Sequence, residues 1–209
     1  MEAAIEKVLE KWARIDVLIN NASALHIAST EDMTMKRYDL ITEVNIRGTY
    51  LISKLCLPYL KKAPNPHILN VSPPYSSIQP KSIRDAKSNW FAPHVAESIS
   101  KFGMTLCAYG MSAEFEEYGI GVNTIWPHTA VESTSVMNKF GGKEAVMISR
   151  KSDIFGDAAY VIVTSDAKKT NGKFFLDDEV ITSTGVKDLS KYKVDPNLPE
   201  HKLMLDFFC

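Results

Sequence analysis

The 209-residue sequence predicts an α/β fold whose sheet is parallel and covered by helices on both faces. Short apolar runs of four to six residues, typical of buried strands, recur along the chain. Longer segments between them carry apolar residues at helical spacing. Strands that alternate with helices in this way run parallel, because each helix returns the chain to the same end of the sheet.

Composition favours one globular domain that binds a small molecule or a protein. The chain is 45% apolar, with only 10 Gly and 10 Pro, which is enough for a sizeable core. Its 24 Lys and Arg against 25 Asp and Glu indicate neither a nucleic-acid nor an anionic-membrane partner. We expect no membrane span, no signal peptide and no metal site, since the 5 His lack ligand spacing. Three widely spaced Cys fit a reducing compartment.

The chain opens with an amphipathic pattern over residues 2–13, which predicts a helix with Ile5, Val8, Leu9 and Trp12 on one face. The apolar run Ile15–Ile19 follows directly and predicts the first strand. It ends in the polar turn Asn20–Ser23.

The second helix–strand unit spans residues 35–71. Apolar residues at helical spacing predict a helix over Met35–Leu60, with Pro58 kinking or ending its last turn. His67–Val71 predicts the next strand, which Ser72–Pro74 breaks. Tyr75–Asn89 is rich in Ser, Lys and Pro and predicts an exposed loop.

The longest helical pattern covers Pro93–Tyr118. Its apolar positions predict one buried face, formed by Val95, Ile99, Phe102, Leu106 and Ala113. Glu97 and Lys101 lie four residues apart on a different strip. They can form an ordinary surface salt bridge, or Lys101 can be an active-site lysine, and the helix alone does not decide between the two.

The rest of the chain predicts two more strands and one more helix. Gly119 is placed as a left-handed helix stop before the strand Gly121–Trp126. A helix around Asp157–Val163 leads to the strand Lys173–Leu176. We therefore expect a domain over residues 1–186 and a polar, linker-like tail over 187–209.

Three polar clusters follow the first three predicted strands: Asn20–Ser23, Ser72–Pro74 and Pro127–Thr129. Each alone is compatible with ordinary turn chemistry. In a parallel sheet, however, the carboxyl ends of the strands share one edge, where ligands bind. Three aligned clusters beside a helix that carries Lys101 therefore favour a binding site.

At these positions the sequence resembles the short-chain dehydrogenase/reductase family. Asn20-Asn21-Ala22 is similar to the family's NNAG turn, with Ser23 in place of Gly. Asn45 in VNIRGTY resembles its helix Asn, and Ser72 in HILNVSPP resembles its catalytic Ser. The similarity covers about residues 1–180, which correspond to the C-terminal two thirds of a Rossmann-type fold. It implies a partial, doubly wound sheet in a chain truncated at its N-terminus.

The resemblance implies an NADP-dependent oxidoreductase that acts on a hydrophobic carbonyl compound or alcohol. In the family, Ser binds the substrate oxygen, Tyr transfers the proton, Lys lowers the pKa of Tyr and holds the nicotinamide ribose, and Asn completes a proton relay. The implied catalytic positions here are Ser72, Lys101, Asn45 and Glu97. The implied cofactor-binding positions are Asn21, Ala22, Ser23, Lys101, Pro127, His128 and Thr129.

The sequence departs from the family in three places. Glu97 stands where the family has Tyr, and a carboxylate beside the Lys101 ammonium should have a lowered pKa and carry no proton at pH 7. Neither Tyr75 nor Tyr109 has the family spacing. No G-x-G-x-x-G is present to bind the dinucleotide pyrophosphate. The loop Tyr75–Asn89 is longer than in the family.

Two functional hypotheses follow. The chain is a short-chain oxidoreductase, or it is a catalytically inactive, truncated member that acts by protein association. The resemblance also implies a homo-oligomer formed through the two long helices, and a peroxisomal or mitochondrial location. The C-terminal LDFFC is not a peroxisomal address, and no other targeting signal is visible.

Overall fold

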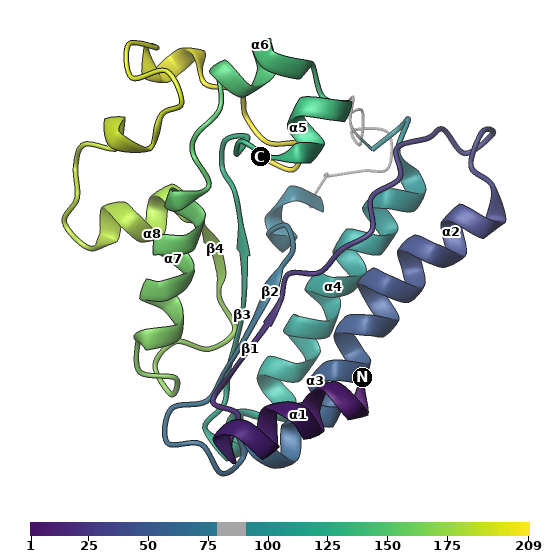
Figure 1. The fold of residues 1–209 in the computed structure, drawn as a ribbon, viewed down its shortest axis with the longest axis vertical. Coiled ribbons are helices and arrows are strands. Elements are labelled where there is room, and N and C mark those ends of the chain that lie inside the picture. Colours follow the sequence, from purple (N-terminus) through teal and green to yellow (C-terminus); the bar gives the residue numbers. More distant parts are fainter. Residues whose placement is uncertain (79–90) are drawn as a thin grey trace.

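The computed structural model describes residues 1–78 and 91–209. Its centre is a four-stranded sheet of order β1-β2-β3-β4 in which every neighbouring pair is parallel. The strands are β1 (Val17–Asn20), β2 (His67–Val71), β3 (Gly121–Trp126) and β4 (Phe174–Leu176). The predicted α/β fold with a parallel sheet is confirmed, and all four strands lie where the sequence predicts them (Figure 1).

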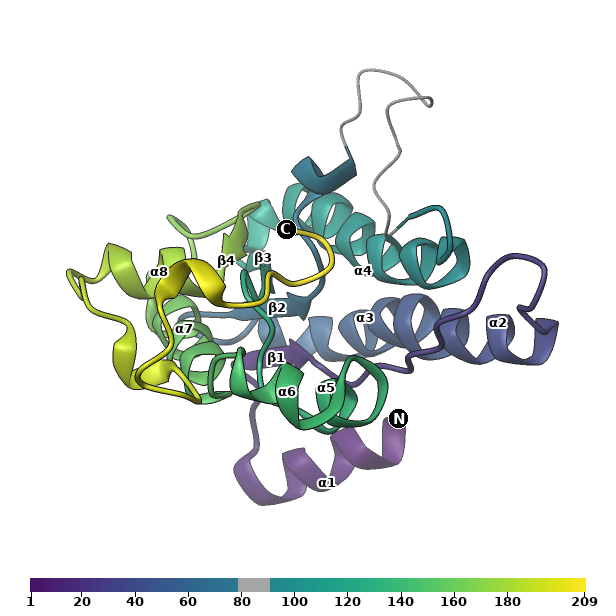
Figure 2. The ribbon, with the colours of Figure 1, turned by 90° about the horizontal axis from the view of Figure 1, so that it is seen from above.

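Helices cover both faces of the sheet (Figure 2). One side holds α2 (Met35–Thr42), α3 (Gly48–Leu60) and α4 (Val95–Glu114), and the other holds α7 (Asp153–Thr164) and α8 (Asp177–Ser183). Ile68 and Val122 point into the first core, which also includes Ile5 of α1 (Glu2–Trp12). Leu69 and Ile125 point into the second core, against α7 and α8. Alternate strand residues thus fill two separate cores.

The predicted helix Met35–Leu60 is interrupted in its middle. A π-helical turn, η1 (Glu43–Arg47), separates α2 from α3 and contains the buried Asn45. Pro58 lies in the last turn of α3, which ends at Leu60 as the sequence indicates. Periodicity does not reveal a π-turn, because one extra residue shifts the apolar pattern only slightly.

The buried face of α4 is not the one that its apolar spacing predicts. Phe102 is buried, but Ile99 is 46% exposed and Leu106 is 55% exposed, and Val95 and Ala113 also face outward. The strip buried against the sheet is largely polar or small: Glu97, Ser98, Lys101, Met104, Thr105 and Ala108. The prediction failed because this helix has two apolar surfaces, one of which forms an open groove with Ile46 and Tyr50. Gly119 ends the segment in the left-handed conformation as predicted (φ 68°).

Several elements near the carboxyl ends of the strands were not predicted. Two short helices, α5 (Thr134–Lys139) and α6 (Gly142–Met147), lie above the sheet, and α8 follows β4 directly (Figure 1). The remaining short turns are η2 (Tyr75–Ile78), η4 (Glu116–Tyr118), η5 (Ser190–Tyr192) and η6 (Glu200–Lys202). Most of the predicted loop Tyr75–Asn89 lies outside the described residues.

The C-terminal tail was expected to resemble a linker, and that expectation is wrong. Tyr192, Leu203 and Phe208 are buried, because the segment folds back over the strand ends. Tyr192 joins the second core, and Phe208 packs in a separate cluster with Phe102 and Trp126. The division into residues 1–186 and 187–209 stays a prediction.

None of the helices in residues 1–78 and 91–209 has the length and apolar character that a bilayer span would need. The same residues contain no group of three His, Cys, Asp or Glu side chains placed to hold a metal ion.

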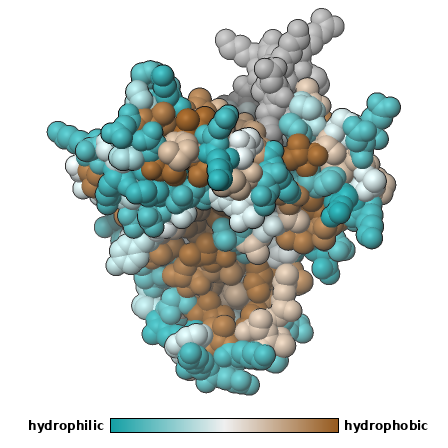
Figure 3. Space-filling model, turned by 45° about the horizontal axis from the view of Figure 1, so that its top comes forward, coloured by the Kyte–Doolittle hydropathy of each residue, from teal (hydrophilic) through white to brown (hydrophobic). Residues whose placement is uncertain are grey.

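β1 is an edge strand, because it is the first strand in the sheet order. Ile19 on it is 46% exposed. Figure 3 shows a broad hydrophobic area in the middle of the viewed face, below the more polar upper part. An edge strand with unpaired main-chain groups and apolar surroundings is prone to association.

Candidate active site

A cavity of about 440 Å³ lies at the carboxyl ends of the strands. Val71 and Trp126 contribute from β2 and β3, and Glu97 and Lys101 contribute from α4. Other walls come from the segment after β1, the segment 127–140, the start of α7 and the C-terminal residues 204–208. A mostly apolar cavity with a few polar groups at this edge of a parallel sheet is a typical ligand site.

The cavity collects some of the predicted site residues and leaves out others. The side chains that line it include Asn21, Ser23, Glu97, Lys101 and Pro127. Ala22, Asn45, Ser72, His128 and Thr129 do not appear among its lining residues in the described part of the chain.

Lys101 is buried at the wall of this cavity. It is only 8% exposed, and its Nζ donates a hydrogen bond to Ser23 Oγ at 2.8 Å. The same Nζ lies 5.5 Å from the centroid of the Trp126 ring, within cation–π range. Burial lowers the pKa of Lys101, although the charges of Glu97 and Asp206 act in the opposite direction. The active-site interpretation of this lysine fits the structure better than a surface role.

Glu97 is also buried, with 1% exposure. Its Oε2 accepts a hydrogen bond from the main-chain N–H of His26 at 3.2 Å, and its Oε1 has no partner among the described residues. No ion pair joins it to Lys101, so the surface salt bridge, one of the two alternatives left open by the sequence, is not formed. The expected lowering of its pKa is also wrong. Burial raises the pKa of Glu97, and the His26 N–H and the charges of Lys101 and Lys139 offset this only in part.

Asn45 fixes the segment that carries Ser23. Its Oδ1 accepts a hydrogen bond from Ala24 N, and its Nδ2 donates to Ala24 O and to Ser100 Oγ, each at 2.9 Å. Ser100 in turn donates to the main-chain oxygen of Glu97. The side chain of Asn45 therefore ties the turn after β1 to α4, and it does so from the buried π-turn.

Ser72 directly follows Val71, which lines the cavity, but Ser72 itself is fully buried. Its Oγ has no hydrogen-bond partner in the described part of the chain. Thr105 Oγ1 donates to the main-chain oxygen of Pro73 at 2.7 Å, which holds this segment against α4. An unpaired buried hydroxyl costs free energy, so its retention is compatible with a ligand contact.

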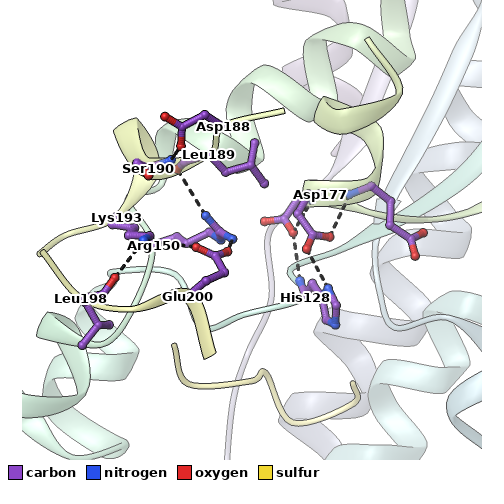
Figure 4. A network of polar contacts seen from close by, with 11 residues as sticks. His128, Arg150, Asp177, Asp188, Leu189, Ser190, Lys193, Leu198 and Glu200 are labelled. Atoms are coloured by element: carbon purple, nitrogen blue, oxygen red, sulfur yellow. Dashed lines mark hydrogen bonds and ion pairs between the residues drawn. The ribbon is translucent and has the colours of Figure 1, made fainter. Parts of the chain in front are cut away.

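His128 and Thr129 serve the neighbouring elements. The main-chain N–H of His128 donates to Asp177 Oδ1 at 2.9 Å, and its Nδ1 lies 2.8 Å from Asp178 Oδ2 (Figure 4). Thr129 forms an isolated antiparallel bridge with Leu205 of the tail. These contacts anchor α8 and the tail, which explains why neither side chain lines the cavity.

A cluster of charged side chains lies beside the contact between His128 and Asp177. The buried Arg150 pairs with Glu200, and Lys193 Nζ lies 3.4 Å from the same carboxylate (Figure 4). Arg150 Nε and Asp177 Oδ2 have no hydrogen-bond partner among the described residues. Burial raises the pKa of Asp177 to about 6, although two main-chain N–H groups donate to it.

The contribution of the C-terminal tail to the site was not predicted from the sequence. Trp126 Nε1 donates to Asp206 Oδ1 at 2.7 Å, and burial raises the pKa of Asp206 to about 6. Phe208 packs against Trp126 and Phe102, with ring centroids 5.6 and 5.2 Å apart. The signal available in the sequence for Trp126 was its position before Pro127. Nothing in the spacing of residues 203–208 marks Asp206 or Phe208 as its partners.

Comparison with known proteins agrees with this arrangement. The sequence model of the short chain dehydrogenase family matches residues 1–144. Hydroxysteroid dehydrogenase-like protein 2 of Xenopus laevis is 43% identical over 208 residues, which are 100% of this chain and 46% of that protein. The Danio rerio protein of the same name is 43% identical over 205 residues, covering 98% and 46%. The chain thus spans about half the length of the curated relatives it matches.

Solved structures give the same answer. A short chain dehydrogenase from Mycobacterium thermoresistibile superposes with a TM-score of 0.84 and 38% identity, covering 98% of this chain and 68% of that one. The match extends over the sheet, both helical layers and the strand ends that form the cavity. This chain belongs to the short-chain dehydrogenase/reductase family.

Proposed function

We propose that this chain forms the nicotinamide-side and substrate-side walls of an NADP-dependent short-chain oxidoreductase acting on a hydrophobic carbonyl compound or alcohol. Lys101 is the observation that carries the proposal. It is a buried cation at the wall of an apolar cavity, at the sheet edge where ligands bind in parallel folds. Burying an ammonium is costly, which favours a functional reason for its position.

The residues present fit one end of the dinucleotide. An ammonium has three donors, and Ser23 Oγ takes one of those of Lys101, so two can reach the ribose hydroxyls. Asn21 and Pro127 line the same cavity. Because the sequence contains no G-x-G-x-x-G, we assign no residue of this chain to the pyrophosphate. NADP(H), when bound, supplies or accepts the hydride.

The other site residues then have defined roles. Ser72 Oγ is unpaired and adjoins Val71 of the cavity wall, but it is fully buried, so donation to the substrate oxygen requires the wall to open at this position. Asn45 is a positioning residue, since its amide holds Ala24 and thereby Ser23. His128 supports the wall through its contacts with Asp177 and Asp178, and Thr129 does so through its bridge to Leu205.

Binding of NADPH, followed by fluorescence or calorimetry, tests the proposal. We expect saturable binding that weakens about tenfold or more in Lys101→Ala, because a charge-assisted hydrogen bond contributes about 1.5–3 kcal/mol. The matched control is Lys169→Ala, which removes an exposed lysine in the loop before β4. Equal binding by all three proteins, or binding by none, would argue against the proposal.

A second candidate function is protein association without turnover. The observation that favours it is the open groove along α3 and α4, where Tyr50, Ile99 and Leu106 are exposed. If the chain is an enzyme, the same groove is the interface of a homo-oligomer. The two candidate functions are distinguished by NADPH binding, which only the first requires.

A peroxisomal or mitochondrial location stays a prediction, for which imaging of a tagged chain is the test.

A further inference from the structure

Glu97 lies in the site proposed above, yet its chemistry differs from what the sequence indicates. A carboxylate four residues before a lysine is expected to pair with that lysine on the surface. Here the Lys101 ammonium bonds to Ser23, and Glu97 is left without an ion-pair partner in residues 1–78 and 91–209. The two side chains share the cavity wall without neutralising each other through a direct contact.

A buried carboxylate without a partner is unfavourable, and taking up a proton removes the cost. The Glu97 side chain is only 1% exposed, and only one of its two carboxyl oxygens accepts a hydrogen bond. Three groups favour its ionised form: Lys101, Lys139 and the main-chain N–H of His26 in the segment after β1. Glu97 itself lies in the first turn of α4, where the helix dipole also favours a carboxylate. Burial outweighs them.

We propose that Glu97 holds a proton in the resting protein and donates it from Oε1 to the oxygen of a carbonyl substrate in the cavity. This inference rests on the proposed oxidoreductase function. It assigns to a carboxylic acid the step that the family's Tyr performs. Oε1 is the unpaired oxygen, because Oε2 accepts the main-chain N–H of His26. Oε1 is itself buried, so a substrate oxygen reaches it by displacing atoms of the cavity wall.

In the direction of reduction, a bound reduced nicotinamide would supply a hydride to the carbonyl carbon and be left oxidised, and the C=O π pair would become a lone pair on oxygen. That oxygen takes the proton of Glu97, which leaves an alcohol and the Glu97 carboxylate. Lys101 and Lys139 stabilise the carboxylate by charge, and a water proton restores the acid. In oxidation, Glu97 starts as the carboxylate and accepts the alcohol proton.

Covalent labelling tests the protonation state without any cofactor. A hydrophobic carbodiimide such as dicyclohexylcarbodiimide adds to protonated carboxylic acids and leaves a stable N-acylurea that peptide mass spectrometry locates. At neutral pH we expect stronger labelling of Glu97 than of the exposed Glu116, because burial raises the pKa of Glu97. The Glu97 label should decrease as the pH rises, and should persist in Asp206→Asn.

Turnover separates this inference from the function on which it rests. Glu97→Gln keeps the size and the acceptor for the His26 N–H but cannot give up a proton. We expect it to bind NADPH like the unchanged chain and to lower kcat for a hydrophobic ketone about 100-fold or more. Glu97→Asp, which retains an acid, should keep part of the rate.

The outcomes distinguish the catalytic role of Glu97 from the oxidoreductase function. If Glu97 is labelled no faster than Glu116 at neutral pH, or if Glu97→Gln binds NADPH and turns over at the unchanged rate, Glu97 is not the acid and the oxidoreductase function stands. If the unchanged chain does not bind NADPH, the oxidoreductase function fails and the catalytic role of Glu97 fails with it.

Discussion

Asn45 shows how much one buried side chain can position. It makes three hydrogen bonds from a fully buried place, and two of them satisfy the main-chain groups of Ala24. Removing the amide leaves buried donors and acceptors unpaired, at about 1–3 kcal/mol for each unsatisfied group. The contribution of Asn45 is thus structural first, and it reaches the cavity through Ser23.

We predict that Asn45→Ala lowers the free energy of unfolding by about 2–4 kcal/mol, because several buried groups lose their partner together. Urea denaturation followed by circular dichroism measures it. Asn197→Ala, at an exposed position, is the control and should change stability by less than about 0.5 kcal/mol. A loss in Asn45→Ala no larger than in the control would show that the segment after β1 is held by other contacts.

Asp177 predicts a pH dependence of stability. Its pKa in the folded protein is about 6, against an ordinary value of 3.8, so the folded state binds the proton more tightly than the unfolded state. Stability from this group is therefore full below about pH 4 and is lost as the pH rises through about 6. The shift of about two units corresponds to a loss of about 3 kcal/mol.

Asp177→Asn removes this titration, and its Oδ1 can still accept from His128 N and Asp178 N. We predict that its unfolding free energy, relative to the unchanged chain, rises by up to about 3 kcal/mol between pH 4 and pH 7. Urea denaturation at several pH values measures the difference, with the exposed Asp39→Asn as the control. A difference that is flat across this range, or that falls, would contradict the assigned shift.

The site residues show what sequence reasoning reaches at this scale. Lys101, Glu97, Ser23, Asn21 and Pro127 were predicted and do line one cavity, because strand ends in a parallel sheet must converge. The direction of the pKa shift of Glu97 was predicted wrongly. Sequence spacing showed a neighbouring cation, but desolvation depends on what packs around the side chain, which spacing does not report.

At the scale of elements, α4 illustrates why an apolar pattern can point to the wrong face. The helix packs a polar and small strip on the sheet, since the site chemistry lies on that side, and leaves Ile99 and Leu106 outside. Strand positions were easier, because β2 and β3 are short segments rich in Ile, Leu and Val and bounded by turns. α5, α6 and α8 are short helices without a long periodic pattern, so sequence analysis missed them.

Two glycines of α4 provide a matched test of how closely this helix is packed. A Cβ on Gly103 would lie 2.5 Å from Ile46 Cγ1, whereas one on Gly110 would meet nothing within 4 Å. Alanine favours a helix over glycine by about 1 kcal/mol, so packing decides the sign. We predict that Gly110→Ala raises the free energy of unfolding by about 0.5–1 kcal/mol.

The same change at Gly103 should lower it by about 1–2 kcal/mol, because the η1 turn must move away from α4. Thermal and urea denaturation of the two variants provide the comparison. Stabilisation by both alanines would mean that Ile46 adjusts freely and that the contact between α4 and η1 is loose.

At the scale of the whole molecule, one helical layer is covered by the tail and the other carries an exposed apolar groove. Its second core is closed by α7, α8 and the returning tail, whose Tyr192 was expected to belong to a linker. The opposite helical layer presents the groove of α3 and α4, and β1 leaves a strand edge unpaired at the end of the sheet order. The parallel direction of the strands followed from the alternation of strands and helices, whereas the tail's path depends on long-range contacts that no local pattern encodes.

The groove predicts self-association, since Ile99 and Leu106 form an apolar strip with Tyr50, which is 56% exposed. We predict that the chain forms a homo-oligomer through this surface, and that Leu106→Lys shifts it toward the monomer by placing a charge in the desolvated centre. Sedimentation velocity over a concentration series measures the shift, with circular dichroism confirming that the fold is kept. Tyr160→Lys, on the exposed side of α7, is the matched control and should leave the oligomer intact. If both variants dissociate alike, or if neither does, the contact lies elsewhere, and the open edge of β1 becomes the surface to test.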